Sequence, residues 1–361
     1  TRLLDRHGLA SRLATRKFLE QIDELHPDII QIHNIHGYFL NYKMLFDYLA
    51  KTDIKVVWTV HDCWLYAGHC YHYSSAGCPK WRTGCGNCPQ KKSFPASWLL
   101  DRSAKNYIDK KTAFTSLAPG QLTIVTVSNW MKEEMADSFL GSLPFRVIHN
   151  GIDTETFKPA SEKDMSATRT AFGIDMDSHV LLGLASIWLK EKGLGDFMQL
   201  AKLLKSDEQI VLVGKMTAEQ QELVEKTNAS LAEGQKRIVT IPRTDNVMQL
   251  AALYSMADVF LNPTWQDNYP TVNMECQSCG TPLITYRTGG SIESHCSETG
   301  TVVEQGDIKG LRRAIDDYRS LDRETLREVC RSHAVQNFRK NDRYSDYFEL
   351  YSSLMTYNKK I

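Results

Sequence analysis

Short apolar runs alternate with longer amphipathic segments along the whole chain. Each run is bounded by turn or polar residues and is followed by a stretch with helical periodicity, which is the pattern of parallel α/β layers. In the first part these runs lie at 29–33, 55–61, 122–128 and 146–150. The alternation continues with runs at 180–185 and 259–261. We therefore predict an α/β protein built on parallel sheets.

Length and turn chemistry predict two domains. The 361 residues allow about two domains, and 42% hydrophobic with 24% charged residues is ordinary for a globular chain. A turn at Asn150-Gly151 ends the last strand of the first part.

Charge and hydropathy exclude several protein classes. The 43 basic and 43 acidic residues cancel, so the chain lacks the overall field that attracts nucleic acid. A long apolar span and a signal-peptide pattern are both absent from the sequence, which argues against an integral membrane or secreted protein. The expected location is the cytoplasm. The chain begins at Thr1 rather than at a methionine, which suggests a trimmed or truncated product.

The segment N-P-T-W-Q-D-N-Y-P-T-V-N-M-E is the strongest chemical signal. It places the carboxylates Asp267 and Glu275 eight positions apart. The residues after Pro270 predict a helix that ends at Gly280, before a proline. Thr271 and Glu275 then share one face of that helix, and Val272, Cys276 and Cys279 share the other.

This arrangement suits a ligand that carries both phosphate and hydroxyl groups. An anion near the amides of Thr271 and Val272 meets free N–H donors and the positive end of the helix dipole. Asp267 and Glu275 can hold neutral hydroxyls beside it. A nucleotide sugar has both groups. The alternative is an ordinary strand-loop-helix unit with surface acids.

These residues resemble the retaining glycosyltransferases of family 4, which have the GT-B fold of two facing Rossmann-like domains. The donor loop of that family is matched by Asp267, Glu275, Cys279, Gly280 and Pro282. A following G-G-x-x-E loop is matched by Gly289, Gly290 and Glu293. Two departures are that Asp267 stands where the family usually has Glu, and that Asn268-Tyr269-Pro270 replaces Gly-Phe-Gly.

The resemblance also implies roles for residues outside this loop. Lys192 matches the lysine that contacts the donor diphosphate, but Ser186 or Ile187 stands where the family has an arginine. Lys190 either substitutes for that arginine or is a surface lysine. His61, in W-T-V-H-D, matches the histidine that touches the donor sugar. The alternative for His61 is a strand-capping histidine that bonds Asp62 or the backbone.

The implied catalytic residues are His61, Asp267 and Lys192. Glu275 binds the ribose, and base selectivity depends on the backbone near Thr240 to Arg243. The residues implied in donor binding are Glu275, Asn268, Tyr269, Pro270, Thr271, Lys190, Ser186 and Arg243. The departing phosphate oxygen helps to deprotonate the acceptor hydroxyl, and catalysis needs no cofactor. A D-x-D pair at Asp175-Met176-Asp177 would suit metal-dependent transfer, but it falls where turn acids are common.

The implied architecture has an acceptor-side domain at 1–152 and a nucleotide-sugar domain at 153–339. The segment 340–361 packs back on the first domain, with Tyr344 to Tyr357 as its best helix. Because the family opens with further strands and a Gly-rich loop before a segment like Ile29, the N-terminal domain is expected to be incomplete. His33 and His36 fall at a strand end that lines the acceptor cleft, where a polar wall is favoured over a metal pair.

A cysteine-rich insert spans residues 63–88. It contains five of the nine cysteines, and four of them run as C-x7-C-x6-C-x2-C in a Gly- and Pro-rich background, at Cys70, Cys78, Cys85 and Cys88. In a reducing compartment a structural zinc with four thiolates is favoured, with disulfides, an iron-sulfur cluster or free buried thiols as alternatives. A similar insert occurs in a subset of the family that resembles colanic-acid and capsule glycosyltransferases.

The predicted function is retaining transfer of a sugar from a UDP- or GDP-sugar to a saccharide or lipid-linked acceptor in bacterial surface polysaccharide synthesis. The alternatives are a nucleotide-sugar epimerase of similar fold and a non-catalytic donor-binding subunit. No nucleic-acid partner is expected. A basic amphipathic stretch at 2–18 suits peripheral contact with anionic lipid at the inner face of the membrane. The competing interpretation is a solvated helix whose apolar face packs on the sheet.

Overall fold

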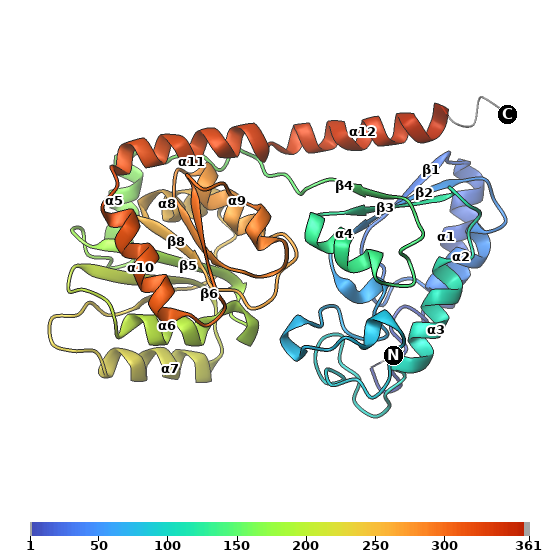
Figure 1. Ribbon diagram of the computed structural model, residues 1–361, viewed down its shortest axis with the longest axis horizontal. Coiled ribbons are helices and arrows are strands. Elements are labelled where there is room, and N and C mark those ends of the chain that lie inside the picture. The colour runs from blue at the N-terminus through green and yellow to red at the C-terminus, as the bar shows by residue number, and fades with distance from the viewer. Residues whose placement is uncertain (1, 357–361) are drawn as a thin grey trace. The chain divides into compact units, whose positions relative to one another are not determined.

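The computed structural model describes residues 2–356, which form two compact units (Figure 1). The first unit contains the chain up to His149 and again from Ser345 onward, and the second runs from Asn150 to Tyr344. The predicted boundaries at 152/153 and 339/340 stay predictions, as do the acceptor-side and donor-side roles. Tyr357, the predicted end of the last helix, lies outside the described residues.

The first unit is built on one parallel sheet whose strands follow chain order. The strands are β1 (Ile29–Ile32), β2 (Lys55–Val60), β3 (Leu122–Thr126) and β4 (Phe145–Val147). The helices are α1 (Arg12–Leu25), α2 (Tyr42–Leu49), α3 (Ser103–Phe114) and α4 (Asn129–Ala136). Two of them begin at side-chain caps, because Asn41 accepts from the amide of Met44 and Ser128 from that of Met131.

Aromatic rings hold α2 and α3 against this sheet. The ring of Phe114 lies 4.9 Å from both Phe46 and Trp58, and all three side chains are buried. The last helix of the chain, α12 (Lys340–Thr356), contributes to the same unit. Its Leu350 packs with Val57 and other sheet residues, and Tyr347 shares a 2.8 Å hydrogen bond with Thr59.

The connection from β2 to α3 contains only the 3-10 turns η1 (Cys63–Leu65), η2 (Ser74–Ala76) and η3 (Lys80–Arg82). A buried lysine, Lys110, anchors its beginning. The Nζ of Lys110 donates to the carbonyl oxygens of Trp64 and Ala67, each at 2.6 Å. Burial lowers the pKa of this amine to about 7.

The second unit has a six-stranded parallel sheet in the order β10-β9-β8-β5-β6-β7. Its strands are β5 (His179–Ile187), β6 (Glu208–Lys215), β7 (Val239–Ile241), β8 (Val259–Asn262), β9 (Leu283–Tyr286) and β10 (Gly300–Val303). The chain order reverses on either side of β5, because β6 pairs on one side and β8 on the other. In such sheets ligands bind beyond the carboxyl ends of the strands at that reversal.

Helices cover both faces of this sheet (Figure 1). One face carries α6 (Leu194–Ala201), α7 (Ala218–Ala229) and α10 (Ile308–Arg319), and the other carries α5 (Glu162–Ala171), α8 (Val247–Met256), α9 (Thr271–Ser278) and α11 (Arg323–Asn337). Successive residues of β5 alternate between the two cores: Leu181 packs with Phe197 of α6, and Leu182 with Leu253 of α8. Both faces are therefore buried, which explains the continuous apolar runs.

The two parallel sheets confirm the predicted α/β class with Rossmann-like halves. The buried Cys276 and Cys279 belong to the α8 and α9 side of the core, as the helical spacing predicts. Gly280 ends this helix with φ +84°, and a Cβ there would lie 2.3 Å from Arg327 Cγ. Among residues 2–356 no helix has the length and apolar character needed to span a membrane.

Candidate active site

Two loops meet at the carboxyl ends of the neighbouring strands β5 and β8. The first contains the turn η4 (Lys190–Lys192), and the second follows Asn262. Gly193 ends η4 with φ +76°, and a Cβ at this position would lie 2.2 Å from the carbonyl oxygen of Pro263. Only glycine fits such an approach. The amide of Trp265 also donates to the carbonyl of Glu191 at 2.7 Å, so the two loops are locked together.

The contact between the two loops places two of the predicted catalytic residues next to each other. Lys192 Nζ lies 2.7 Å from Asp267 Oδ2, and the side chains are 33% and 19% exposed. The other oxygen of Asp267 accepts from the amide of Asn268 at 2.9 Å. The result is a partly exposed cation and carboxylate held at a strand end, where they can meet a charged and hydroxyl-bearing ligand.

Helix α9 begins at Thr271, directly after Pro270, and no side-chain cap satisfies its first amides. Thr271 is exposed. One turn later Glu275 accepts a hydrogen bond from Tyr254 Oη at 2.8 Å. Burial raises the pKa of Glu275, while hydrogen bonds from Tyr254 and Thr271 act in the opposite direction. The predicted common face of Thr271 and Glu275 is therefore present.

The loop residue Tyr269 lies among charged groups of the same unit. Burial raises the pKa of its hydroxyl, Glu293 raises it further, and Arg343 opposes both. Glu293 ends η5 (Gly289–Glu293), the segment that resembles the G-G-x-x-E loop. The loop after β8 is thus surrounded by a carboxylate from η5 and a guanidinium from the start of α12.

A buried network of hydrogen bonds holds the two ends of this loop. The sequence analysis did not predict this network. Asn262 Nδ2 donates to Asn273 Oδ1 at 2.7 Å. Asn273 Nδ2 in turn donates to Ser291 Oγ at 3.0 Å and to Ser294 Oγ at 2.9 Å. The four side chains are buried. An asparagine between apolar residues on a helix is the only sequence signal, because its partners lie on distant segments.

The remaining predicted donor residues lie on exposed surface. Ser186 is near the end of β5, and Lys190 is the first residue of η4. Arg243 follows β7 and pairs with Asp245 at 2.7 Å. The carboxylate of Asp175, in the D-x-D segment, accepts from the amide of Asp177 and from Lys236. This arrangement is the turn that the sequence interpretation favoured over a metal site.

In the first unit, His61 follows β2 and His33 follows the neighbouring strand β1. Nδ1 of His33 lies 3.0 Å from Nε2 of His61, and the rings are stacked at 5.3 Å. Burial lowers the pKa of both imidazoles. Asp62 accepts from the amide of Trp64 and pairs with His36 at 2.8 Å. The His33–His61 pair was not predicted, although parallel neighbours end at one sheet edge and the signal was therefore available.

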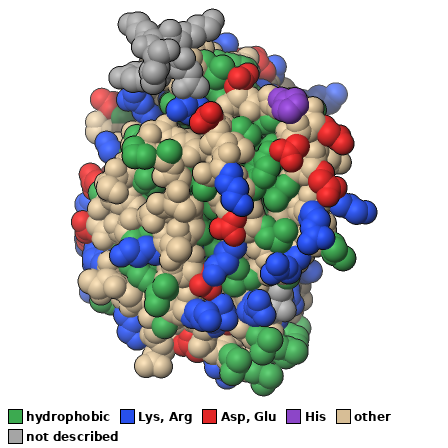
Figure 2. All heavy atoms as spheres, turned by 90° about the vertical axis from the view of Figure 1, so that its right-hand side faces the viewer, with side chains coloured by type: hydrophobic (Ala, Val, Ile, Leu, Met, Phe, Trp, Pro, Cys, Tyr) green, Lys and Arg blue, Asp and Glu red, His purple; other side chains and the backbone are tan. Residues whose placement is uncertain are grey.

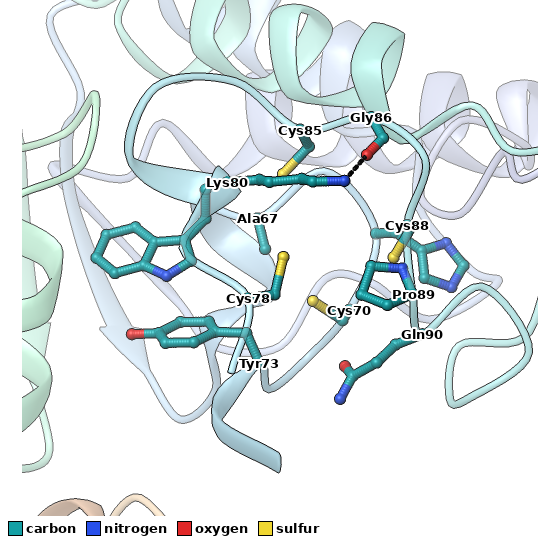
Figure 3. A pocket seen from close by; sticks show the side chains of 12 residues that line it. Ala67, Cys70, Tyr73, Cys78, Lys80, Cys85, Gly86, Cys88, Pro89 and Gln90 are labelled. Carbon is teal, nitrogen blue, oxygen red and sulfur yellow. Dashed lines mark hydrogen bonds between the residues drawn. The ribbon is translucent and has the colours of Figure 1, made fainter. Parts of the chain in front are cut away.

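Four of the five cysteines of the insert surround a small cavity of about 20 Å³. Figure 3 shows Cys70, Cys78, Cys85 and Cys88 around it, with Lys80 extending to the carbonyl of Gly86 at 2.9 Å. All nine cysteines of the chain are free thiols, so the disulfide alternative is wrong for this structure. The hydrogen bond with Cys70 lowers the pKa of the Cys88 thiol to about 7.

The thiols do not fit a metal site in their present positions. Among residues 2–356 no three His, Cys, Asp or Glu side chains form a group that could hold a metal ion. The thiols of Cys70 and Cys88 share a hydrogen bond, and the Sγ of Cys85 accepts a hydrogen bond from the amide of Gly68 at 3.2 Å. The zinc site predicted at Cys70, Cys78, Cys85 and Cys88 therefore stays a prediction.

Comparison with known proteins agrees with this geometry. Residues 1–156 match the family described as Glycosyltransferase Family 4, and residues 178–319 match the family described as Glycosyl transferases group 1. The chain belongs to the glycosyltransferases of family 4. This membership confirms the predicted enzyme class, a glycosyltransferase of the hexosyltransferase type with the GT-B fold.

Individual proteins are similar to this chain over different lengths. The colanic acid biosynthesis glycosyl transferase WcaC of Escherichia coli is 24% identical over 313 residues, which cover 83% of this chain and 72% of WcaC. The capsular polysaccharide biosynthesis glycosyltransferase CapM of Staphylococcus aureus is 24% identical over 50% of this chain, and the match spans under half of CapM, 46%. The crystal structure of Anabaena HepE with UDP covers 94% of this chain and 82% of HepE, with a TM-score of 0.69 and 16% identity.

Proposed function

We propose that this family 4 glycosyltransferase transfers a sugar from a nucleotide-sugar donor, with retention of configuration, to a saccharide or lipid-linked acceptor in bacterial surface polysaccharide synthesis. The observation that carries the proposal is the Lys192–Asp267 pair beside the start of α9. WcaC and CapM, by their names, act in colanic acid and capsular polysaccharide biosynthesis. HepE has been solved with UDP and with UDP-glucose.

The donor diphosphate is assigned to Lys192 and to the backbone N–H groups of Tyr269 and Thr271, since Pro270 between them has no N–H. These amides lie where the dipole of α9 is positive, and their positions are set before the ligand arrives. A leaving diphosphate gains charge as its bond to the sugar breaks, so a preorganised cation and backbone N–H donors at the start of the helix stabilise the transition state. Lys190 supplies the second cation where Ser186 replaces the arginine of the family.

Glu275 is assigned to the ribose hydroxyls, and Asp267 with His61 to the donor sugar. In the proposed step the bond from the anomeric carbon to the phosphate oxygen breaks, and a bond to the acceptor oxygen forms on the same face. The acceptor proton passes to the departing phosphate oxygen. Because burial lowers the pKa of His61, its imidazole is neutral at pH 7 and can exchange hydrogen bonds with a sugar hydroxyl.

The test combines thermal unfolding with product analysis. The protein is titrated with UDP, GDP, ADP and CMP and their common sugars, with and without EDTA. A ligand that binds only the folded state raises the unfolding temperature by mass action. We expect one base to stabilise the protein, and Lys192→Met to reduce the shift at the same nucleotide concentration. Lys226→Met serves as the control, because Lys226 pairs with Glu222 on the exposed surface of α7.

The same experiment separates the competing functions. The proposal is supported if NMR shows that the sugar is transferred to an acceptor and keeps its anomeric configuration. A changed sugar formed from the donor alone indicates an epimerase. Binding without turnover indicates a donor-binding subunit, an alternative that Ser186 at the arginine position favours. Absence of a shift with every nucleotide contradicts the donor assignment itself.

A further inference from the structure

An apolar surface lies at one end of the first unit, away from its sheet. We call it the 94–100 surface. Its members are Phe94 (55% exposed), Trp98 (62%), Leu99 (65%), Leu100 (54%), Leu3 (50%) and Leu4 (45%). Figure 2 shows hydrophobic side chains gathered at the lower end of this side of the molecule, with lysines and arginines above them. Contiguous exposed groups of this kind mark interaction sites.

The backbone beneath this surface is held in place. The amide of Trp98 donates to the carbonyl of Arg2 at 2.8 Å, and that of Leu100 donates to the carbonyl of Leu3 at 3.2 Å. Ser97 is buried, and its Oγ donates to the carbonyl of Leu100 at 2.6 Å. Two segments far apart in sequence therefore present their apolar side chains together. These apolar side chains are therefore exposed on a backbone that is held by hydrogen bonds.

Basic residues surround the apolar side chains. Segments 2–6 and 91–105 together contain six basic and two acidic residues. The basic residues are Arg2, Arg6, Lys91, Lys92, Arg102 and Lys105. Of the two acids, Asp5 is buried and bonded to His69, and Asp101 accepts from the amides of Cys88 and Ser103. Arg102 is paired with Asp109 at 2.8 Å and Asp101 is exposed, so five remaining basic residues stand against one carboxylate and the net charge of this surface is positive.

We propose that the 94–100 surface docks on an anionic lipid bilayer. Trp98, Leu99 and Leu100 would enter the boundary between headgroups and acyl chains, and the surrounding cations would meet lipid phosphates. A second copy of the chain fits less well, because a two-fold interface places the same patch on both partners and brings like charges together. The proposal does not depend on the donor chemistry.

This surface differs from the one that the N-terminal sequence suggested. Helix α1 buries Thr15 and Ile22. Its most exposed apolar residues, Leu13 and Leu25, are at opposite ends, about 18 Å apart at the rise of an α-helix. They form no continuous apolar strip. Leu3 and Leu4, which precede the helix, belong instead to the 94–100 surface.

The test is sedimentation of the full chain with vesicles of phosphatidylcholine alone or mixed equally with phosphatidylglycerol. We expect binding to the mixed vesicles, weakened by salt. The variant Trp98→Ser/Leu99→Ser/Leu100→Ser should lose at least about tenfold in affinity. Lys92→Ala and Lys105→Ala should each lose about fivefold. The matched control, Leu13→Ser/Leu25→Ser, removes equally exposed residues of α1 and should bind as the wild type.

Fluorescence gives a direct second measurement. Trp98 is the most exposed tryptophan of the first unit, and Trp265 of the second unit is 37% exposed. Lipids brominated in the acyl chain should quench the emission of the wild type but not that of Trp98→Phe, which keeps the apolar surface.

Three results would overturn the proposal. One is unchanged vesicle binding in the triple serine variant when its unfolding temperature matches that of the wild type. Another is loss of binding in Leu13→Ser/Leu25→Ser, which would assign membrane contact to α1. The third is a dimer in sedimentation velocity that the triple variant dissociates, without vesicle binding, which would assign the surface to a second copy.

Discussion

Lys192 and Asp267, 75 positions apart in the sequence, form an ion pair with 2.7 Å between Nζ and Oδ2. The pair joins the loops after two neighbouring strands of the second unit. Since both side chains are partly exposed, the pair contributes at most about 1 kcal/mol to stability. Its main effect is to position the two side chains assigned to the donor, the cation and the carboxylate, next to each other.

Substitutions of Lys192 and of Asp267 should have different effects on nucleotide binding and on kcat. Lys192→Met should weaken nucleotide binding by roughly 10- to 100-fold, because a charged hydrogen bond to phosphate is worth about 1.5–3 kcal/mol. Asp267→Asn should leave nucleotide affinity equal or higher, since Lys192 loses its competing partner, while kcat falls by about 100-fold or more. Calorimetry with the nucleotide and steady-state kinetics separate the two effects. Equal loss of nucleotide affinity in both variants would contradict the assignment.

Glu275 should control donor binding more strongly than its partner Tyr254. Glu275→Ala should abolish binding measurable by calorimetry, whereas Tyr254→Phe should cost only a few-fold, because Glu275 keeps its contact with Thr271. Burial raises the pKa of Glu275. The ionised carboxylate is the form that accepts hydrogen bonds from the ribose hydroxyls. As the pH falls, Glu275 should therefore become protonated, and donor binding should weaken, at a higher pH than for an exposed glutamate. Unchanged affinity in Glu275→Ala would refute the ribose assignment.

The histidine pair predicts a shift in the acidic limb of the pH–rate profile. Burial lowers the pKa of His61, and charge on His33 lowers it further. His33→Gln removes the second effect, so the pKa of His61 rises and activity should begin to fall at a higher pH than in the wild type. The exposed His26, after α1, offers His26→Gln as a control with an unchanged profile. The prediction fails if the limb stays in place in His33→Gln.

A buried carboxylate away from the active site should carry much of the stability of the second unit. The side chain of Glu208 is fully buried and is bonded to Arg312 at 2.5 and 2.8 Å and to Arg319 at 3.2 Å. Replacing Glu208 by Gln removes the buried carboxylate from both arginines, which keep only the more exposed Asp316 and Asp207, and should cost about 2 kcal/mol at neutral pH. Urea denaturation of both proteins measures the difference.

The difference in unfolding free energy between the wild type and Glu208→Gln should decrease as the pH falls. Burial raises the pKa of Glu208, but the bonds to Arg312 outweigh this effect and leave the pKa below its usual value. A carboxyl with a lowered folded pKa contributes stability above its unfolded pKa of about 4.3, and loses it as the pH falls through the folded pKa. The gap between wild type and Glu208→Gln should therefore be full at neutral pH and close under acid conditions. A gap that persists in acid would contradict this cause.

Thiol labelling should distinguish the alternatives for the cysteine-rich insert. Because Cys88 has its pKa lowered to about 7, it is partly thiolate at neutral pH and should react first with iodoacetamide. The buried Cys63 and Cys276 should react only after unfolding. Labelling that requires a chelator, together with release of zinc, would instead support the predicted metal site.

Much of the layer structure could be predicted from the chain because its cause is local. The run at 259–261 became β8 (Val259–Asn262), and the helix expected between Pro270 and Gly280 became α9 (Thr271–Ser278). Helix ends depend on residues that are visible in the sequence, such as the glycine at φ +84° after α9. The face shared by Thr271 and Glu275 follows from the period of the helix alone.

Contacts between distant segments could not be obtained in this way. The sequence indicates Lys192 and Asp267 separately, but their pairing depends on β5 and β8 being neighbours and on Gly193 approaching Pro263. The thiols of the insert have metal-like spacing, yet those of Cys70 and Cys88 share a hydrogen bond and that of Cys85 accepts one from a backbone amide. Spacing restricts which side chains can meet, and the packing of the intervening backbone decides which do.

The sequence by itself therefore determined the alternation of strands and helices and the family, and it supplied the residues that we propose for the donor site. Only the tertiary structure decided the Asn262–Asn273 network, the His33–His61 pair and the joining of Leu3 to the segment that ends at Leu100. The physical reason is that periodicity and capping act over a few residues. Hydrogen bonds and burial between remote segments depend instead on strand order and on close packing, which no local pattern contains.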